Sequence, residues 1–158
     1  MASISELVLN HPANAGLRRY FEPRQRLGMA GLLFPNEVER PYESLGTHPD
    51  LVARLWDELG SALPDDCRAI FFGTPALIHP QSGMVFGFAG GTHTYGLRLP
   101  EKERQEAVAA GVVRIKHYPG KQASLDLASF GDEWMFCGWF KDEERWCRAA
   151  YDFAAFNG

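Results

Sequence analysis

Five histidines are the side chains of this sequence best suited to bind a metal ion. His79 and His93 flank a glycine-rich apolar stretch, and both fall on one face of the hairpin predicted below. Along that hairpin they are separated by four positions of the central strand, roughly 13 Å at about 3.3 Å per residue. Ligands about 2.0 Å from a single ion cannot span that distance, so the spacing predicts no metal site.

Two cysteines, Cys137 and Cys147, could act as nucleophiles if an imidazole lay nearby. Each is next to an aromatic residue, however, and small buried hydrophobes are the commoner role for such cysteines. Asp126, Asp132 and Glu133 could form an acid/base pair, but solvated loop carboxylates are the preferred interpretation. The sequence contains no GxSxG, HExxH or phosphate-binding loop, so we expect no cofactor and favour a non-enzymatic protein.

One group of aromatic and polar residues is a candidate ligand-binding cleft. Pockets for small molecules combine an aromatic lining with a few polar groups, as this group does. Its members are His93, Tyr95, Arg98, Trp134 and Trp139. The alternative is that the aromatic side chains fill the core, and this alternative is the one we favour.

The composition is that of one folded domain: 158 residues, 46% hydrophobic and 23% charged. A net charge of −4 gives no general attraction to nucleic acid, so nucleic-acid binding is not expected. A local cluster of four arginines is best explained as a solvated or ion-paired surface: Arg18, Arg19, Arg24 and Arg26. No apolar run approaches the roughly 20 residues of a membrane helix. Three cysteines without a CxxC pair are typical of a reducing compartment, which predicts a cytoplasmic protein.

The stretch from Arg68 to Pro100 predicts a three-stranded antiparallel meander. Gly90 and Gly91 are taken as a two-residue turn, which places Phe86 opposite Tyr95. That register gathers large side chains on one face of the hairpin and small ones on the other.

The small-residue face is predicted to contain Gly87 and Gly96, where another segment could approach the backbone closely. The apolar segment Leu27–Phe34 is the expected occupant, unless it contacts a partner subunit. Pro75 is expected to divide the first strand into two pieces of an edge strand, Arg68–Gly73 and Ala76–His79.

Helices are predicted on both sides of the meander. The first covers residues 47–62, with Thr47 or His48 as its cap, and the second runs from Pro100 to Gly111. A last helix follows Asp142 as its cap. Alternating and aromatic patterns predict further strands at 112–118 and 134–140.

The expected fold is α+β: a small curved antiparallel sheet flanked by helices. Residues 1–46 are expected to be an N-terminal arm that packs on the domain or on a partner, and residues 47–158 the domain itself. An apolar arm segment and an interrupted edge strand both need cover, which predicts a homodimer as one way to provide it.

The order of these strands resembles the TfoX N-terminal domain and the related YjbR-type proteins. The matching segments are Phe72-Gly73, His79–Gly87, Tyr95–Arg98, Glu103–Gly111 and the last helix with Trp146. The resemblance covers Leu51 to Phe156; the Met1–Gly46 arm is extra. It implies a curved antiparallel sheet flanked by helices, and TfoX proteins are regulators of competence that act with the transcription machinery. It implies no catalytic residue.

The sequence therefore predicts a non-enzymatic domain that acts through protein contacts with an unknown partner, and a regulatory role for it. The alternative is a small-molecule-binding protein or enzyme that uses the aromatic cleft near His93 and Trp139.

Overall fold

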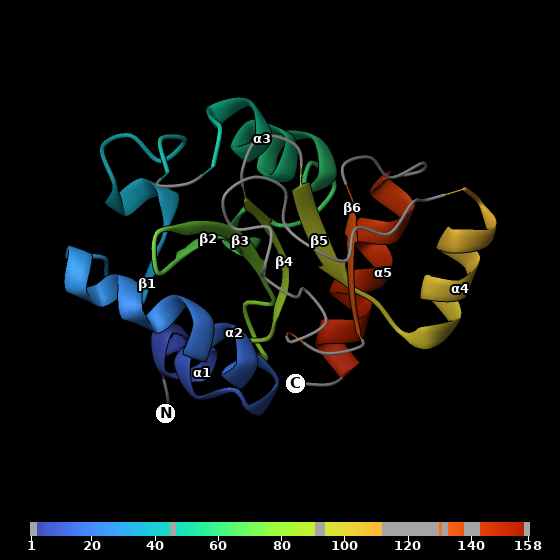
Figure 1. Cartoon of the computed structure of the whole chain (residues 1–158), viewed down its shortest axis with the longest axis horizontal. Helices are drawn as coiled ribbons and strands as arrows, with labels where there is room; N and C mark the ends of the chain where they lie inside the picture. The colour runs from blue at the N-terminus through green and yellow to red at the C-terminus, as the bar shows by residue number, and fades with distance from the viewer. Residues whose placement is uncertain are drawn as a thin grey trace.

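The structure is a computed structural model and describes residues 3–44, 47–90, 94–111, 130, 133–137 and 143–156. Within these residues, six strands form one open antiparallel sheet whose spatial order follows the chain (Figure 1). The strands are β1 (Leu32–Leu33), β2 (Arg68–Phe71), β3 (Thr74–Ile78), β4 (Val85–Gly90), β5 (Thr94–Arg98) and β6 (Trp134–Cys137). The helices of this part of the chain are α1 (Ile4–Asn10), α2 (Ala15–Phe21), α3 (Pro49–Ala53), α4 (Glu101–Ala109) and α5 (Glu143–Phe156). The fold is α+β, as the sequence predicts.

Helices cover both faces of the sheet. On one face, α3 continues into a π-helical segment, η4 (Arg54–Leu59), which packs with α5 against β3, β4 and β5. On the other face, α1 and α2 contribute Val8, Leu17 and Phe21 to an aromatic cluster with Phe71 and Phe88. Figure 1 shows α1 and α2 together at one side of the molecule, far from α4. The N-terminal segment is therefore one of the two helical layers around the core.

The two pieces expected to form one edge strand are separate strands inside the sheet. β2 lies between β1 and β3, and β2 and β3 form a tight hairpin. Its turn is Phe72 (φ 48°) and Gly73 (φ 79°), both left-handed, as a two-residue hairpin turn of this twist requires. Pro75 precedes the first β3–β4 pair, Ala76 with Phe88, so no β4 residue lies opposite its missing amide.

The predicted register of β4 and β5 is wrong. Gly90 belongs to β4 and lies opposite Thr94, so Gly90-Gly91 is not the two-residue turn between these strands. As a result, Tyr95 lies opposite Ala89, and a small residue of one strand faces a large residue of the other. Phe88, for example, lies opposite Gly96.

The space beside the two strand glycines is filled by the sheet itself. A Cβ on Gly96 would lie 2.5 Å from the ring of Phe136 in β6, and one on Gly87 would lie 3.2 Å from Leu97. The segment Leu27–Phe34 was expected to cover these glycines, but its Leu32–Leu33 portion forms β1 at the edge of the sheet. Leu27 remains 67% exposed. This expectation is wrong because strand neighbours, and not the N-terminal segment, provide the large side chains.

The predicted helices are present, with one difference. His48 caps α3 by accepting a hydrogen bond from the amide of Asp50, and the stripe Leu51, Leu55 and Leu59 is buried. The second half of this helix is π-helical rather than α-helical. α4 begins after Pro100 and buries only Ala107, as a surface helix does.

β6 begins at Trp134, the first residue of the strand predicted over 134–140. The strand predicted at 112–118 and the cap Asp142 lie outside the described residues. No described helix is long and apolar enough to cross a membrane.

Candidate functional site

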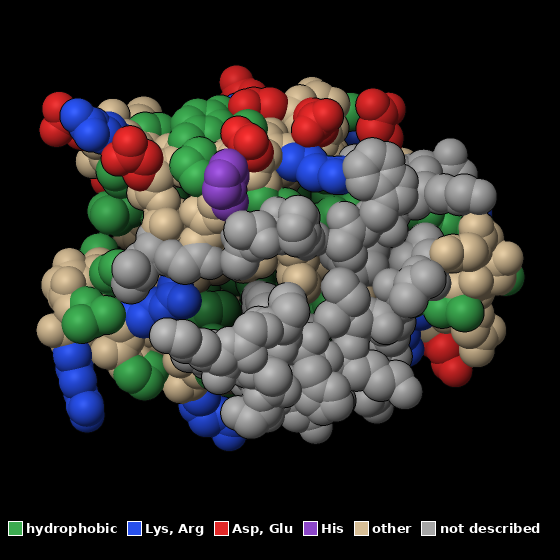
Figure 2. Space-filling model, turned by 45° about the horizontal axis from the view of Figure 1, so that its top comes forward, with side chains coloured by type: hydrophobic (Ala, Val, Ile, Leu, Met, Phe, Trp, Pro, Cys, Tyr) green, Lys and Arg blue, Asp and Glu red, His purple; other side chains and the backbone are tan. Residues whose placement is uncertain are grey.

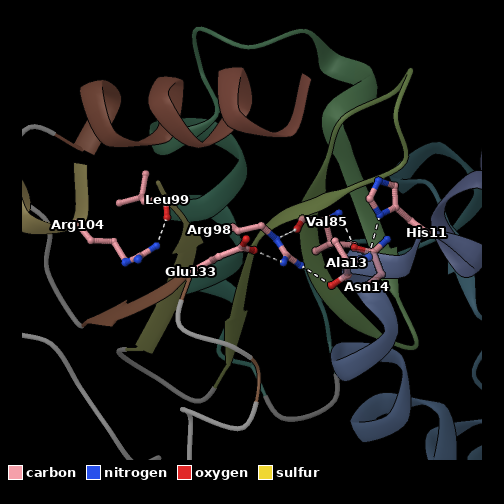
Figure 3. Close-up of polar contacts among 8 residues, drawn as sticks. All are labelled: His11, Ala13, Asn14, Val85, Arg98, Leu99, Arg104 and Glu133. Carbon is pink, nitrogen blue, oxygen red and sulfur yellow. Dashed lines mark hydrogen bonds and ion pairs between the residues drawn. The ribbon is translucent and has the colours of Figure 1, made fainter. Parts of the chain in front are cut away.

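Arg98 is the centre of a buried polar network at one end of the sheet (Figure 3). Its side chain is 3% exposed and reaches across the core to the N-terminal layer. It donates from Nε to the carbonyl of Val85 at 3.0 Å and from Nη2 to the carbonyl of Ala13 at 3.0 Å. Nη1 contacts Glu133 Oε2 at 2.9 Å, and the guanidinium lies 4.7 Å from the ring centre of Trp134. Burial lowers the pKa of Arg98, while the hydrogen bond and charge of Glu133 raise it.

Asn14 is the second member of this network and is fully buried. Its Nδ2 donates to the carbonyls of Val8 at 2.8 Å and Gly83 at 2.9 Å, and its Oδ1 accepts from the amide of Val85 at 2.9 Å. The carbonyl of Val8 would ordinarily accept from the residue four positions later, which is Pro12 and has no amide hydrogen. Asn14 thus provides the hydrogen-bond donor that the last turn of α1 lacks, and it joins this helix to β4.

The backbone of Val85 explains why these two side chains meet. Val85 lies beyond the last β4–β5 pair, Gly87 with Leu97, and next to the irregularity in the β3–β4 register. Its amide and carbonyl are bound by Asn14 and Arg98. Buried backbone groups must be paired, so both side chains are used to hold the fold together.

The residues of the predicted aromatic cleft do not all come together. Arg98 and Trp134 lie opposite each other on β5 and β6, and Trp134 belongs to the aromatic cluster that packs against α1 and α2. Tyr95 belongs to the cluster on the other face of the sheet, where Arg54 lies over its ring. His93 and Trp139 lie outside the described residues.

His79 has a structural role at the β3–β4 turn. Its Nδ1 accepts from the amides of Gln81 at 3.3 Å and Ser82 at 3.2 Å, and the ring is only 4% exposed. Burial lowers the pKa of His79, with the charge of Asp66 acting in the opposite direction. A neutral ring is what the turn requires, because a protonated Nδ1 could not accept these bonds.

Two of the cysteines are buried thiols. Burial raises the pKa of Cys67 to about 12, assisted by Asp66. Burial likewise raises the pKa of Cys147 to about 12, assisted by the nearby Cys67. A thiol with such a pKa is not a nucleophile at neutral pH. Cys137 lies in β6, and its side chain is not among those described.

The arginine cluster is partly used within the N-terminal layer. Arg18 donates to the carbonyl of Leu9 at 2.8 Å and pairs with Glu22 at 3.4 Å. Arg24 lies over the ring of Phe21 and donates to Thr74. Arg19 and Arg26 are exposed. In Figure 2 the Asp and Glu side chains gather along the top, whereas Lys and Arg side chains lie both among them and along the lower left.

An open groove of about 770 Å³ lies where β1 ends and β2 begins. Ser5 of α1 borders it, and its other walls come from the Pro35–Glu37 turn (η3) and the Asp65–Cys67 turn (η5). It combines apolar and charged side chains: Leu32, Phe34, Glu37, Asp65, Asp66 and Arg68. Such a mixture on a concave surface is typical of a binding site.

The positive charge in this groove is already compensated. Arg68 Nη1 lies 2.9 Å from Asp57 Oδ1, and the hydroxyl of Tyr42 donates to the same carboxylate at 2.9 Å. Burial, together with the hydrogen bond to Asp57, raises the pKa of Tyr42. Asp65 and Asp66 are exposed and make no ion pair with the described residues. The groove therefore presents a net negative charge.

Sequence reasoning missed both the groove and Asn14. The Pro64-Asp65-Asp66 run reads as a break before the meander, and nothing in the sequence pairs it with Pro35–Glu37. Asn14 follows Pro12 at the end of a helix, which is a signal for a capping side chain, although its strand partners could not be inferred.

Within the described ranges, no group of three His, Cys, Asp or Glu side chains is arranged to hold a metal ion.

Comparison of the chain with protein-family models, curated proteins and solved structures gave no match.

Proposed function

We propose that this chain is a binding module that acts on another protein through its surface, without catalysing a reaction. The observation that carries the proposal is the groove beside β1, which is lined by both exposed carboxylates and apolar side chains. A regulatory role, in line with the resemblance to TfoX N-terminal domains, is part of the same proposal.

The way in which the buried reactive groups are used supports a binding role. Arg98 and Asn14 are bound to backbone carbonyls and amides, and His79 holds a turn. The Cys67 and Cys147 thiols are buried with raised pKa values. The groove, in contrast, is lined by exposed polar groups, which suits recognition better than chemistry.

Photo-cross-linking in the cells that produce the protein tests this proposal. A benzophenone amino acid replaces Asn36, which is exposed and borders the groove, or Gln105, which is exposed on α4. We expect a discrete cross-linked protein with the Asn36 substitution and none with the Gln105 substitution. Equal cross-linking at both positions, or none at either, would contradict the proposal.

The alternative function, a small-molecule site in the aromatic cleft, requires His93 and Trp139 to join Arg98 and Trp134. A thermal-shift screen with nucleotides, metals and acidic metabolites tests it. A saturable rise in melting temperature that is lost in the His93→Ala variant would favour this alternative over the binding module.

A further inference from the structure

On the outer edge of β1, the backbone groups of Leu32 make no hydrogen bond to another described residue and can pair with a ligand in the groove. The amide of Phe72 donates to the carbonyl of Gly31 at 3.2 Å, which makes Gly31 and Phe72 a hydrogen-bonded pair. Bonded and non-bonded pairs alternate in an antiparallel ladder, so the next residue, Leu32, directs its amide and carbonyl away from β2. β1 is the edge strand of the sheet, and Leu32 also borders the groove. An extended chain could pair with it there.

Apolar side chains provide the floor for such a chain. Leu32, Phe34 and Pro35 line the groove, and Phe34 and Pro35 are only partly buried. An added strand presents alternate side chains to such a floor and the intervening ones to its rim. The floor therefore selects an apolar residue at every second position.

The rim of the groove selects positive charge at the intervening positions. Asp65 and Asp66 are exposed carboxylates that line the groove, and Glu37, whose Oε1 accepts from the amide of Phe34 at 2.8 Å, adds a third. Arg68, the one basic residue among the described lining, is paired with Asp57 at 2.9 Å and does not neutralise them. Carboxylates along the groove repel an acidic chain and attract a basic one, which sets both specificity and association rate.

We infer that the groove binds an extended segment of a partner protein in which Arg or Lys alternates with aliphatic residues. The segment pairs with β1 through the backbone of Leu32, places its aliphatic side chains on Leu32 and Phe34, and directs its cations to Asp65 and Asp66. This inference rests on the proposed binding function and names the class of partner for the same groove.

Peptide binding to the purified full chain tests this inference. The probe is a fluorescent peptide of about seven residues, alternating Arg and Val, and its counterpart alternates Glu and Val. We expect saturable binding of the Arg-Val peptide alone. The Asp65→Asn/Asp66→Asn variant should bind it roughly threefold to tenfold more weakly, the loss expected for two exposed ion pairs. N-methylation of alternate amides should weaken binding by about tenfold or more, because it blocks strand pairing.

The matched control is the Glu58→Gln/Glu144→Gln variant, which removes two exposed carboxylates outside the groove. It should bind the Arg-Val peptide as the wild type does, and both variants should keep the wild-type melting temperature. Equal affinity for both peptides, or equal weakening by both variants, overturns the inference. If Asn36 cross-links a protein but the Arg-Val peptide does not bind, the binding function stands and the basic segment is refuted.

Discussion

Replacing Asn14 with alanine is the sharpest test of how the N-terminal layer is attached. The substitution removes three buried hydrogen bonds: to the carbonyls of Val8 and Gly83 and from the amide of Val85. Each bond contributes about 1 kcal/mol net, and a buried group left unpaired adds to the loss. The expected cost is about 4 kcal/mol, a large part of the roughly 5–15 kcal/mol that stabilises a typical domain.

Urea unfolding followed by tryptophan fluorescence measures this cost. At a slope of about 2 kcal/mol per molar, the Asn14→Ala midpoint should fall by about 2 M. Native-state hydrogen exchange gives a second readout, since the amide of Val85 loses its acceptor and should exchange much faster than in the wild type.

Asn10→Ala is the matched control, because Asn10 ends α1 and is exposed. It should change the free energy of unfolding by less than about 0.5 kcal/mol. A loss below about 1 kcal/mol for Asn14→Ala would refute the reasoning, since it would show that water or another group replaces the three bonds.

Three further outcomes are expected. Gly96→Ala should lower the free energy of unfolding by about 1–3 kcal/mol, because its Cβ would lie 2.5 Å from Phe136. Part of this stability should return when Phe136→Leu is added, as measured by urea unfolding. Equal losses with and without Phe136→Leu would contradict the packing. His79 has its pKa lowered by burial, so the unfolded state binds the proton more readily, and the folded state loses stability as the pH falls below about 6.5. His79→Asn keeps an acceptor that does not titrate, so its unfolding free energy should vary less over that range than that of the wild type; parallel curves would exclude the assignment. Cys67 and Cys147, whose pKa values are raised to about 12, should resist iodoacetamide at neutral pH until the protein is unfolded. Peptide mass mapping measures this labelling. Rapid labelling of either cysteine in the native protein would be inconsistent with its burial.

Local patterns were sufficient for the helices and for the α+β class. The Leu51, Leu55, Leu59 stripe and the His48 cap depend on residues within two turns of each other, and the structure contains both. The predicted strand at Trp134 is also present, since an aromatic run of this kind is typical of a buried strand.

Register could not be obtained from the hairpin alone. Pairing large side chains with large ones gives a consistent register when only two strands are considered. In the structure, however, the space beside Gly96 is filled by the ring of Phe136, which lies forty positions later in the sequence. The Phe72-Gly73 turn was missed because phenylalanine rarely adopts a left-handed φ, and a sequence rule expects Asn, Asp or Gly there.

The candidate groove was beyond reach of sequence reasoning for a related reason. Its walls come from Ser5, η3 and η5, which are brought together only when the sheet is complete. No periodicity connects Glu37 with Asp65. The capping role of Arg18 on Leu9 was also hidden among four similar arginines.

Because the strand order follows the chain, it also determines the sequence in which parts of the fold can form during synthesis. From β2 onward each strand pairs with the one made just before it, so the sheet can grow as the chain emerges. The N-terminal helices cannot dock as soon as they are made, because the backbone groups of Gly83 and Val85 that bind Asn14 lie 69 and 71 residues downstream. A ribosome working at about 5–20 residues per second needs roughly 4–14 seconds for that stretch. During this interval Val8, Leu17 and Phe21 lack the strand residues against which they pack, and the helix pair can dock only after β4 has been made.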